Sequence, residues 1–120
     1  IKKAEDIKKK FPSIEIVKWE NIEVRAKDID IIINATSVGI KGEDNFYQEF
    51  METKPDLVYY DIIYNPKETM MIKKFNKKDI QTYNGLEMFI YQGKKSFFLW
   101  NKINPKFDQE LKQNIMKKLK

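Results

Sequence analysis

The chain has 120 residues and a mass of 14.4 kDa, which suits one compact domain with a single hydrophobic core. It contains neither histidine nor cysteine, which excludes disulfides, a Cys/His zinc site, a thiolate nucleophile and an imidazole base. The net charge is +5, yet Arg25 is the only arginine and the lysine clusters are scattered along the chain. Because nucleic-acid recognition favours the guanidinium group, a solvated surface is the preferred interpretation, with a nucleic-acid patch as the alternative.

The apolar runs and the start of the chain give expectations about its cellular location and its completeness. No stretch approaches the roughly 20 apolar residues of a membrane span, and no segment resembles a signal peptide. We therefore expect a cytoplasmic protein without a membrane partner. The sequence opens on Ile1 and continues at once into charged residues typical of the middle of a helix, so we expect a piece of a longer polypeptide.

The first third of the chain predicts a helix and two strands. Helix formers over 1–11 predict a helix that Pro12 ends. A short β-prone run predicts a strand over 14–17, followed by a polar connector over 21–28. The β-branched run 29–33 predicts a strand buried on both faces, and the small polar turn 34–39 is of the kind that opens a ligand crevice at a strand's carboxyl end.

The rest of the chain continues the alternation of strands and helices. After a loop over 42–45 we expect these elements: a short helix over 46–51, a strand over 57–64, a helix over 68–76, a weaker strand over 79–83, a long amphipathic helix over 86–100 and, after Pro105, a last helix over 107–119. Alternating strands and helices predict an α/β fold with a parallel sheet. We expect one partial domain over 1–120, because the glycine-rich phosphate turn that opens such domains is missing.

Three short motifs together resemble a known family. They are Asn34-Ala35-Thr36-Ser37-Val38-Gly39, then Tyr60-Asp61-Ile62-Ile63-Tyr64-Asn65-Pro66 with Thr69, then Asn84-Gly85-Leu86-Glu87-Met88 with Gln92 and Trp100. In this order and spacing they resemble the C-terminal, dinucleotide-binding half of shikimate dehydrogenase, from end to end of the chain. The resemblance implies an incomplete Rossmann-like doubly wound sheet with C-terminal helices. It also implies NADP as the cofactor and the interconversion of 3-dehydroshikimate and shikimate in aromatic amino acid biosynthesis.

The resemblance assigns roles to individual residues of this chain. It implies a cofactor-binding set, which is Thr36, Ser37, Val38, Ile62, Gly85 and Met88, and two substrate-binding residues, which are Tyr64 and Gln92. Several of them have a structural alternative: an ordinary polar strand end for the turn, and core packing for Tyr64 and Met88. Glu87 departs from the small residue, usually glycine, that the family has at that position, which puts the local helix packing in doubt.

The resemblance assigns no catalytic residue and no metal ligand to this chain. The lysine and aspartate that handle the proton in the family belong to an N-terminal domain that nothing here matches, so we expect this fragment alone to be inactive. Asp61 is expected to satisfy backbone donors at a strand end rather than to act as a base. Three points stay open: the specificity for shikimate against quinate, the choice of NADP against NAD, and the oligomeric state. A homodimer is among the alternatives for the last.

Missing strands have consequences for the sheet and the helices. In the strand order 3-2-1-4-5-6, a chain that starts after the second strand lacks the two strands between its first strand and the others. The strand over 14–17 then pairs elsewhere, or the chain is a subset of a longer polypeptide. The last two helices are expected to expose apolar surface.

The competing hypothesis is a stand-alone α/β module that binds a nucleotide or a protein without turnover. Tyr64 and Gln92 discriminate between this module and the enzyme fragment.

Overall fold

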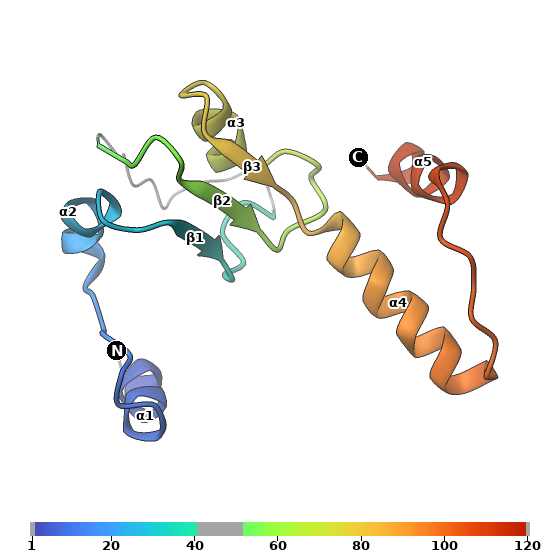
Figure 1. Cartoon of the computed structure of the whole chain (residues 1–120), viewed down its shortest axis with the longest axis horizontal. Coiled ribbons are helices and arrows are strands. Elements are labelled where there is room, and N and C mark those ends of the chain that lie inside the picture. Colours follow the sequence, from blue (N-terminus) through green and yellow to red (C-terminus); the bar gives the residue numbers. More distant parts are fainter. Residues whose placement is uncertain (1, 41–51, 120) are drawn as a thin grey trace. The chain divides into compact units, whose positions relative to one another are not determined.

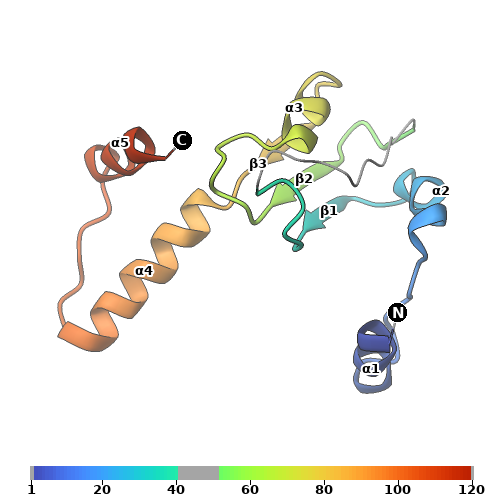
Figure 2. The same ribbon diagram turned by 180° about the vertical axis from the view of Figure 1, so that it is seen from behind.

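A computed structural model describes residues 2–40 and 52–119 of the chain (Figures 1 and 2). The described residues form two compact units, one made of 2–29 with 52–54 and the other of 30–40 with 55–119. The loop predicted over 42–45 and the helix predicted over 46–51 lie outside the described residues. Every residue of the cofactor-binding and substrate-binding sets lies in the second unit.

The first unit is helical. The predicted opening helix is confirmed as α1 (Lys2–Lys10), and its last turn is continued by the Phe11 amide, which donates to the Ile7 carbonyl over 3.0 Å. The predicted strand over 14–17 is wrong, because these extended residues have no ladder partner among the described residues and a single β-prone run cannot form a sheet alone. The connector predicted over 21–28 is also wrong. It holds the end of the 3₁₀ turn η1 (Trp19–Asn21) and the helix α2 (Ile22–Ala26), which buries Ala26.

A parallel sheet of three strands organises the second unit (Figure 1). The order β1 (Ile31–Asn34), β2 (Val58–Asp61) and β3 (Gln81–Tyr83) follows the chain, so each strand lies next to its successor. The register pairs Ile33 with Tyr60 and Tyr60 with Tyr83. The three strands predicted in this unit are confirmed, each shorter than the apolar run that predicted it. The carboxyl ends of all three therefore meet at one edge of the sheet.

Helix α3 (Met70–Asn76) covers one face of this sheet, packing against β2 and β3. Thr69 caps the helix by accepting from the Ile72 amide, and the Tyr59 and Phe75 rings lie 4.6 Å apart between sheet and helix. The core of the unit consists of Leu57, Tyr59, Ile63, Ile72, Phe75, Ile80, Leu86 and Ile90.

The first predicted strand is less buried than its sequence suggested. Ile31 is 56% exposed and Ile33 is 60% exposed, so the prediction of burial on both faces is wrong. Successive side chains of a strand point to opposite faces, and α3 covers only the face opposite to these two isoleucines. The apolar sequence is that of a fully covered strand, while the described part of the second unit covers one side.

Two helices complete the second unit: α4 (Leu86–Asn101), which Lys102 ends in the left-handed conformation, and α5 (Gln109–Lys118), which Asp108 caps. The predicted exposure of apolar surface here is confirmed, and Trp100 is 80% exposed. The other exposed apolar side chains of this region are Met88, Tyr91, Phe97, Phe98, Leu99, Ile103 and Leu111. Among the helices of residues 2–40 and 52–119, none is long and apolar enough to cross a membrane.

Candidate functional site at the carboxyl edge of the sheet

The segments that leave the three strands are tied to one another by backbone hydrogen bonds. The Ile62 amide, just after β2, donates to the Asn34 carbonyl at the end of β1 over 3.1 Å. The Gly85 amide, just after β3, donates to the Ile63 carbonyl over 3.0 Å. The structure thus brings the predicted cofactor-binding set to one edge of the sheet, where ligands bind in open α/β folds. Met88 lies one turn into α4 from this edge.

The turn after β1 is shaped by the side chains of Asn34 and Thr36. The Asn34 Oδ1 atom accepts from the Thr36 amide over 3.1 Å and from the Thr36 hydroxyl over 2.7 Å. The Thr36 hydroxyl in turn accepts from the Val38 amide over 3.2 Å, and the Asn34 Nδ2 atom donates to the Val38 carbonyl. Most of the hydrogen-bonding capacity of Thr36 is therefore used inside the turn. Ser37 is exposed, and within the described residues its hydroxyl makes no hydrogen bond.

Asp61 is a fully buried carboxylate that joins three segments. Its Oδ1 atom accepts from the Ile63 amide over 3.0 Å and from the Asn34 Nδ2 atom over 3.1 Å. Its Oδ2 atom accepts from the hydroxyls of Thr69, over 2.8 Å, and Tyr59, over 3.2 Å. The predicted structural role of Asp61 is confirmed and extends further than a strand end. The same side chain holds the helix cap at Thr69 and, through Asn34, the turn after β1.

Gly85 marks a close backbone approach at this edge. A Cβ atom at this position would lie 1.9 Å from the carbonyl oxygen and 2.4 Å from the carbonyl carbon of Ile62. Both atoms belong to the backbone, so neither can move aside as a side chain would. The absence of a side chain at Gly85 is what lets α4 begin directly against the segment that follows β2.

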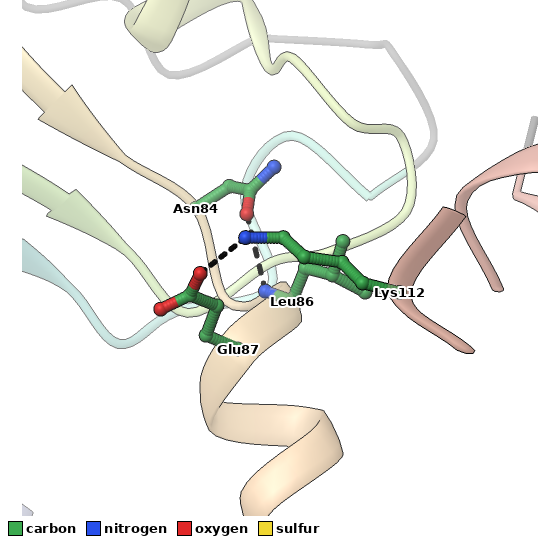
Figure 3. A network of polar contacts seen from close by, with 4 residues as sticks. All are labelled: Asn84, Leu86, Glu87 and Lys112. Atoms are coloured by element: carbon green, nitrogen blue, oxygen red, sulfur yellow. Dashed lines mark hydrogen bonds and ion pairs between the residues drawn. The ribbon is translucent and has the colours of Figure 1, made fainter. Parts of the chain in front are cut away.

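The start of α4 also contacts α5 (Figure 3). Glu87 forms an ion pair with Lys112 of α5, and beside it the Asn84 Oδ1 atom accepts from the Leu86 amide over 3.2 Å. The Asn84 Nδ2 atom donates to the Lys67 carbonyl over 2.9 Å. The side chain of Glu87 is exposed, so the glutamate that replaces the small residue of the family leaves the helix start intact.

The two predicted substrate-binding residues lie on either side of Phe89. The Tyr64 ring, which follows β2, stacks on the Phe89 ring of α4 with centroids 4.2 Å apart and planes inclined by 18°. Gln92 is exposed three residues further along α4, on the same side of the helix as Phe89. The structure therefore places Tyr64 against α4 one turn before Gln92. Their roles toward a substrate stay predictions.

The contacts at this edge involve two further residues, Phe89 and Asn34. Phe89 lies four residues after Gly85 and three before Gln92, so its helical spacing was a signal that it shares their face. Asn34 belongs to the first motif, but its hydrogen bond to Asp61 spans 27 positions of sequence, which no local pattern reveals. Among the described residues no group of three acidic side chains could hold a metal ion.

Comparison with known proteins places this geometry in context. No protein-family model matches the chain. A shikimate dehydrogenase (NADP(+)) of Pelagibacter ubique is 49% identical over 109 residues, which are 90% of this chain and 39% of that protein. The chain spans about two fifths of the length of the curated relatives it matches.

Solved structures give the same answer. A crystal structure of shikimate dehydrogenase from Aquifex aeolicus has a TM-score of 0.69 and 34% identity, covering 87% of this chain and 37% of that one. A shikimate dehydrogenase in complex with NADP+ has a TM-score of 0.63 and 36% identity, covering 77% of this chain and 32% of that one. The resemblance seen in the three sequence motifs is confirmed, and the chain is homologous to part of the shikimate dehydrogenases, with a Rossmann-like fold.

Proposed function

We propose that this chain forms the nicotinamide side of an NADP site and part of the substrate wall of a shikimate dehydrogenase. The observation that carries the proposal is the convergence of the cofactor-binding set on one sheet edge, held there by the hydrogen bonds from Ile62 to Asn34 and from Gly85 to Ile63. The polypeptide that contains this chain would interconvert 3-dehydroshikimate and shikimate. Its curated relatives are named shikimate dehydrogenase (NADP(+)), and one solved structure of a shikimate dehydrogenase is in complex with NADP+.

The residues at this edge fit a nicotinamide nucleotide. The turn over 36–38 offers small side chains and the Ser37 hydroxyl, which has no hydrogen bond to any described residue. The half-buried Ile62 and the 41% exposed Met88 offer apolar surface to a flat ring. Bound NADPH would supply the hydride for reduction of the ketone. The residues of this chain bind and orient, since a rigid turn and a pinned helix start fix the positions of their groups before a ligand arrives.

The substrate would lie against Tyr64 and Gln92. Within the described residues the Tyr64 hydroxyl makes no hydrogen bond, so it is available to a hydroxyl or carboxylate of the ligand. The Gln92 amide can both donate to and accept from a polyhydroxylated ring. Asp61 is buried and accepts four hydrogen bonds, so it is not the group that would supply the proton for the reaction.

The exposed apolar side of α4 fits the same proposal. Trp100 and Phe97 would be covered by the part of the polypeptide that the relatives have beyond the matched two fifths. That part would also supply the proton-transferring residues. The nucleotide-binding module without turnover is the alternative, and it predicts cofactor binding in the absence of shikimate-dependent reduction.

The test uses the polypeptide that carries this chain. Tyr64→Phe and Gln92→Ala are each expected to raise the KM for shikimate by about tenfold, the effect of one lost hydrogen bond of about 1.4 kcal/mol. The KM for NADP+ should stay within about twofold, because neither residue belongs to the cofactor-binding set. Steady-state NADP+ reduction, followed by absorbance, measures both constants.

Matched controls are available on α4 and α5. Tyr91→Phe removes a hydroxyl from an exposed tyrosine of α4, and Gln113→Ala removes an exposed amide of α5. Both should leave the KM for shikimate unchanged. Equal effects of the test and control variants would remove Tyr64 and Gln92 from the site, and the absence of any shikimate-dependent reduction by the unmodified protein would reject the enzymatic function.

A further inference from the structure

The stack of Tyr64 on Phe89 joins a residue that follows β2 to the second turn of α4. The ring centroids are 4.2 Å apart and the planes nearly parallel, and both side chains are half-buried. Stacked aromatic rings prefer a defined separation and inclination, unlike an aliphatic contact, which tolerates rotation of the ring. The contact therefore fixes the plane of the Tyr64 ring as well as filling space.

The backbone beneath the two rings is itself fixed. The Phe89 amide donates to the Gly85 carbonyl over 2.9 Å, and the Gly85 amide donates to the carbonyl of Ile63, the residue before Tyr64. Two successive hydrogen bonds thus connect the backbone of Phe89 to the backbone next to Tyr64. The close approach of Gly85 to Ile62 allows no slack between these segments.

The phenol is held at its ring and left open at its hydroxyl. Phe89 covers one face of the ring, whereas no residue of the described ranges bonds to the hydroxyl. The phenol oxygen lies on the axis of the ring and its O–H bond lies in the ring plane, so a ring whose tilt and plane are both fixed holds the oxygen in one place and directs its hydrogen bond within that plane. The arrangement is that of a group oriented in advance for a ligand, with Gln92 on the same side of α4.

We propose that Phe89 is a positioning residue, which acts on shikimate through Tyr64 and touches no reacting atom. The inference rests on the proposed function, because it requires the Tyr64 hydroxyl to bind substrate. A side chain of similar volume without a flat face would fill the space and leave the phenol free to tilt. Aromatic character at position 89, rather than bulk, then determines how well the substrate is held.

The test is a double-mutant cycle in the polypeptide that carries this chain. Phe89→Leu is expected to raise the KM for shikimate by about three- to tenfold while the KM for NADP+ stays within about twofold. Phe89→Tyr keeps the stack and should retain the KM of the unmodified protein. In a Tyr64→Phe background, Phe89→Leu should change the KM for shikimate by less than about 1.5-fold, because the hydroxyl through which Phe89 acts is gone.

Controls separate positioning from packing and from the proposed function. Phe98→Leu, on the side of α4 opposite to Phe89, should leave both constants unchanged. Phe89→Met repeats the measurement if the leucine variant has a lowered Tm. Two results would overturn the positioning role, provided that the unmodified protein turns over shikimate. One is that Phe89→Leu and Tyr64→Phe raise the KM for shikimate independently, so that their effects multiply in the double variant. The other is an unchanged KM for shikimate in both Phe89→Leu and Phe89→Met. Absence of that turnover would instead reject the proposed function, and the inference with it.

Discussion

Gly85→Ala is expected to lower the free energy of unfolding by at least about 3 kcal/mol, the range of severe overpacking in a rigid site. The new Cβ would meet the carbonyl oxygen of Ile62 at 1.9 Å, so the start of α4 must move away from the segment after β2. That movement would weaken the hydrogen bond from the Gly85 amide to the Ile63 carbonyl. Urea denaturation of the polypeptide that carries this chain, followed by far-UV circular dichroism, measures the change.

Gly93→Ala is the matched control for this substitution. Gly93 lies inside α4, and a Cβ there would meet no atom within 4 Å. Alanine is the better helix former, so this variant is expected to gain about 0.5 to 1 kcal/mol. Changes of opposite sign in the free energy of unfolding would show that the close backbone approach at Gly85, and not the loss of a glycine as such, determines the effect. A Gly85→Ala variant as stable as the unmodified protein would contradict the packing described for this edge.

Local sequence predicted the second unit well where an apolar run is bounded by turn or capping residues. The apolar run 57–64 contains β2, Thr69 caps α3, and Asn84 with Gly85 precedes α4. Each of these signals acts within a few residues, as helix caps and strand periodicity do. The prediction over 14–17 failed because a strand also needs a partner, which lies outside what a local pattern can specify.

The sequence named residues that the structure brings to one edge of the sheet, but it did not indicate the contacts that hold them there. Resemblance named the cofactor-binding set, and the parallel sheet explains why its members meet at one edge. The hydrogen bond from Asn34 to Asp61 and the stack of Tyr64 on Phe89 both join residues distant in sequence. Such contacts depend on register and on the angle at which α4 leaves the sheet, which composition and spacing do not contain.

Asp61→Ala is expected to lower the free energy of unfolding by about 3 to 5 kcal/mol, because a buried carboxylate that serves several donors is lost. The Asn34 amide, the Thr69 hydroxyl and the Ile63 amide would all lose this acceptor, and the cap of α3 would loosen with them. Asp61→Asn keeps the shape but replaces one acceptor oxygen by a donor, so it should cost less, about 2 kcal/mol.

Asp61→Asn should weaken cofactor binding more than substrate binding. Asn34 holds the turn over 36–38 and is itself held by Asp61, so in Asp61→Asn we expect a KM for NADP+ raised by about threefold to tenfold. The KM for shikimate should change less, because Tyr64 is fixed separately by Phe89. Asp56→Asn removes a charge from an exposed aspartate ahead of the same strand and should alter stability by less than about 0.5 kcal/mol. If Asp61→Asn were as stable as Asp56→Asn, the buried hydrogen-bond network of Asp61 would not hold this edge together. If Asp61→Asn were less stable but had unchanged KM values for NADP+ and shikimate, the network would stabilise the fold without shaping the turn.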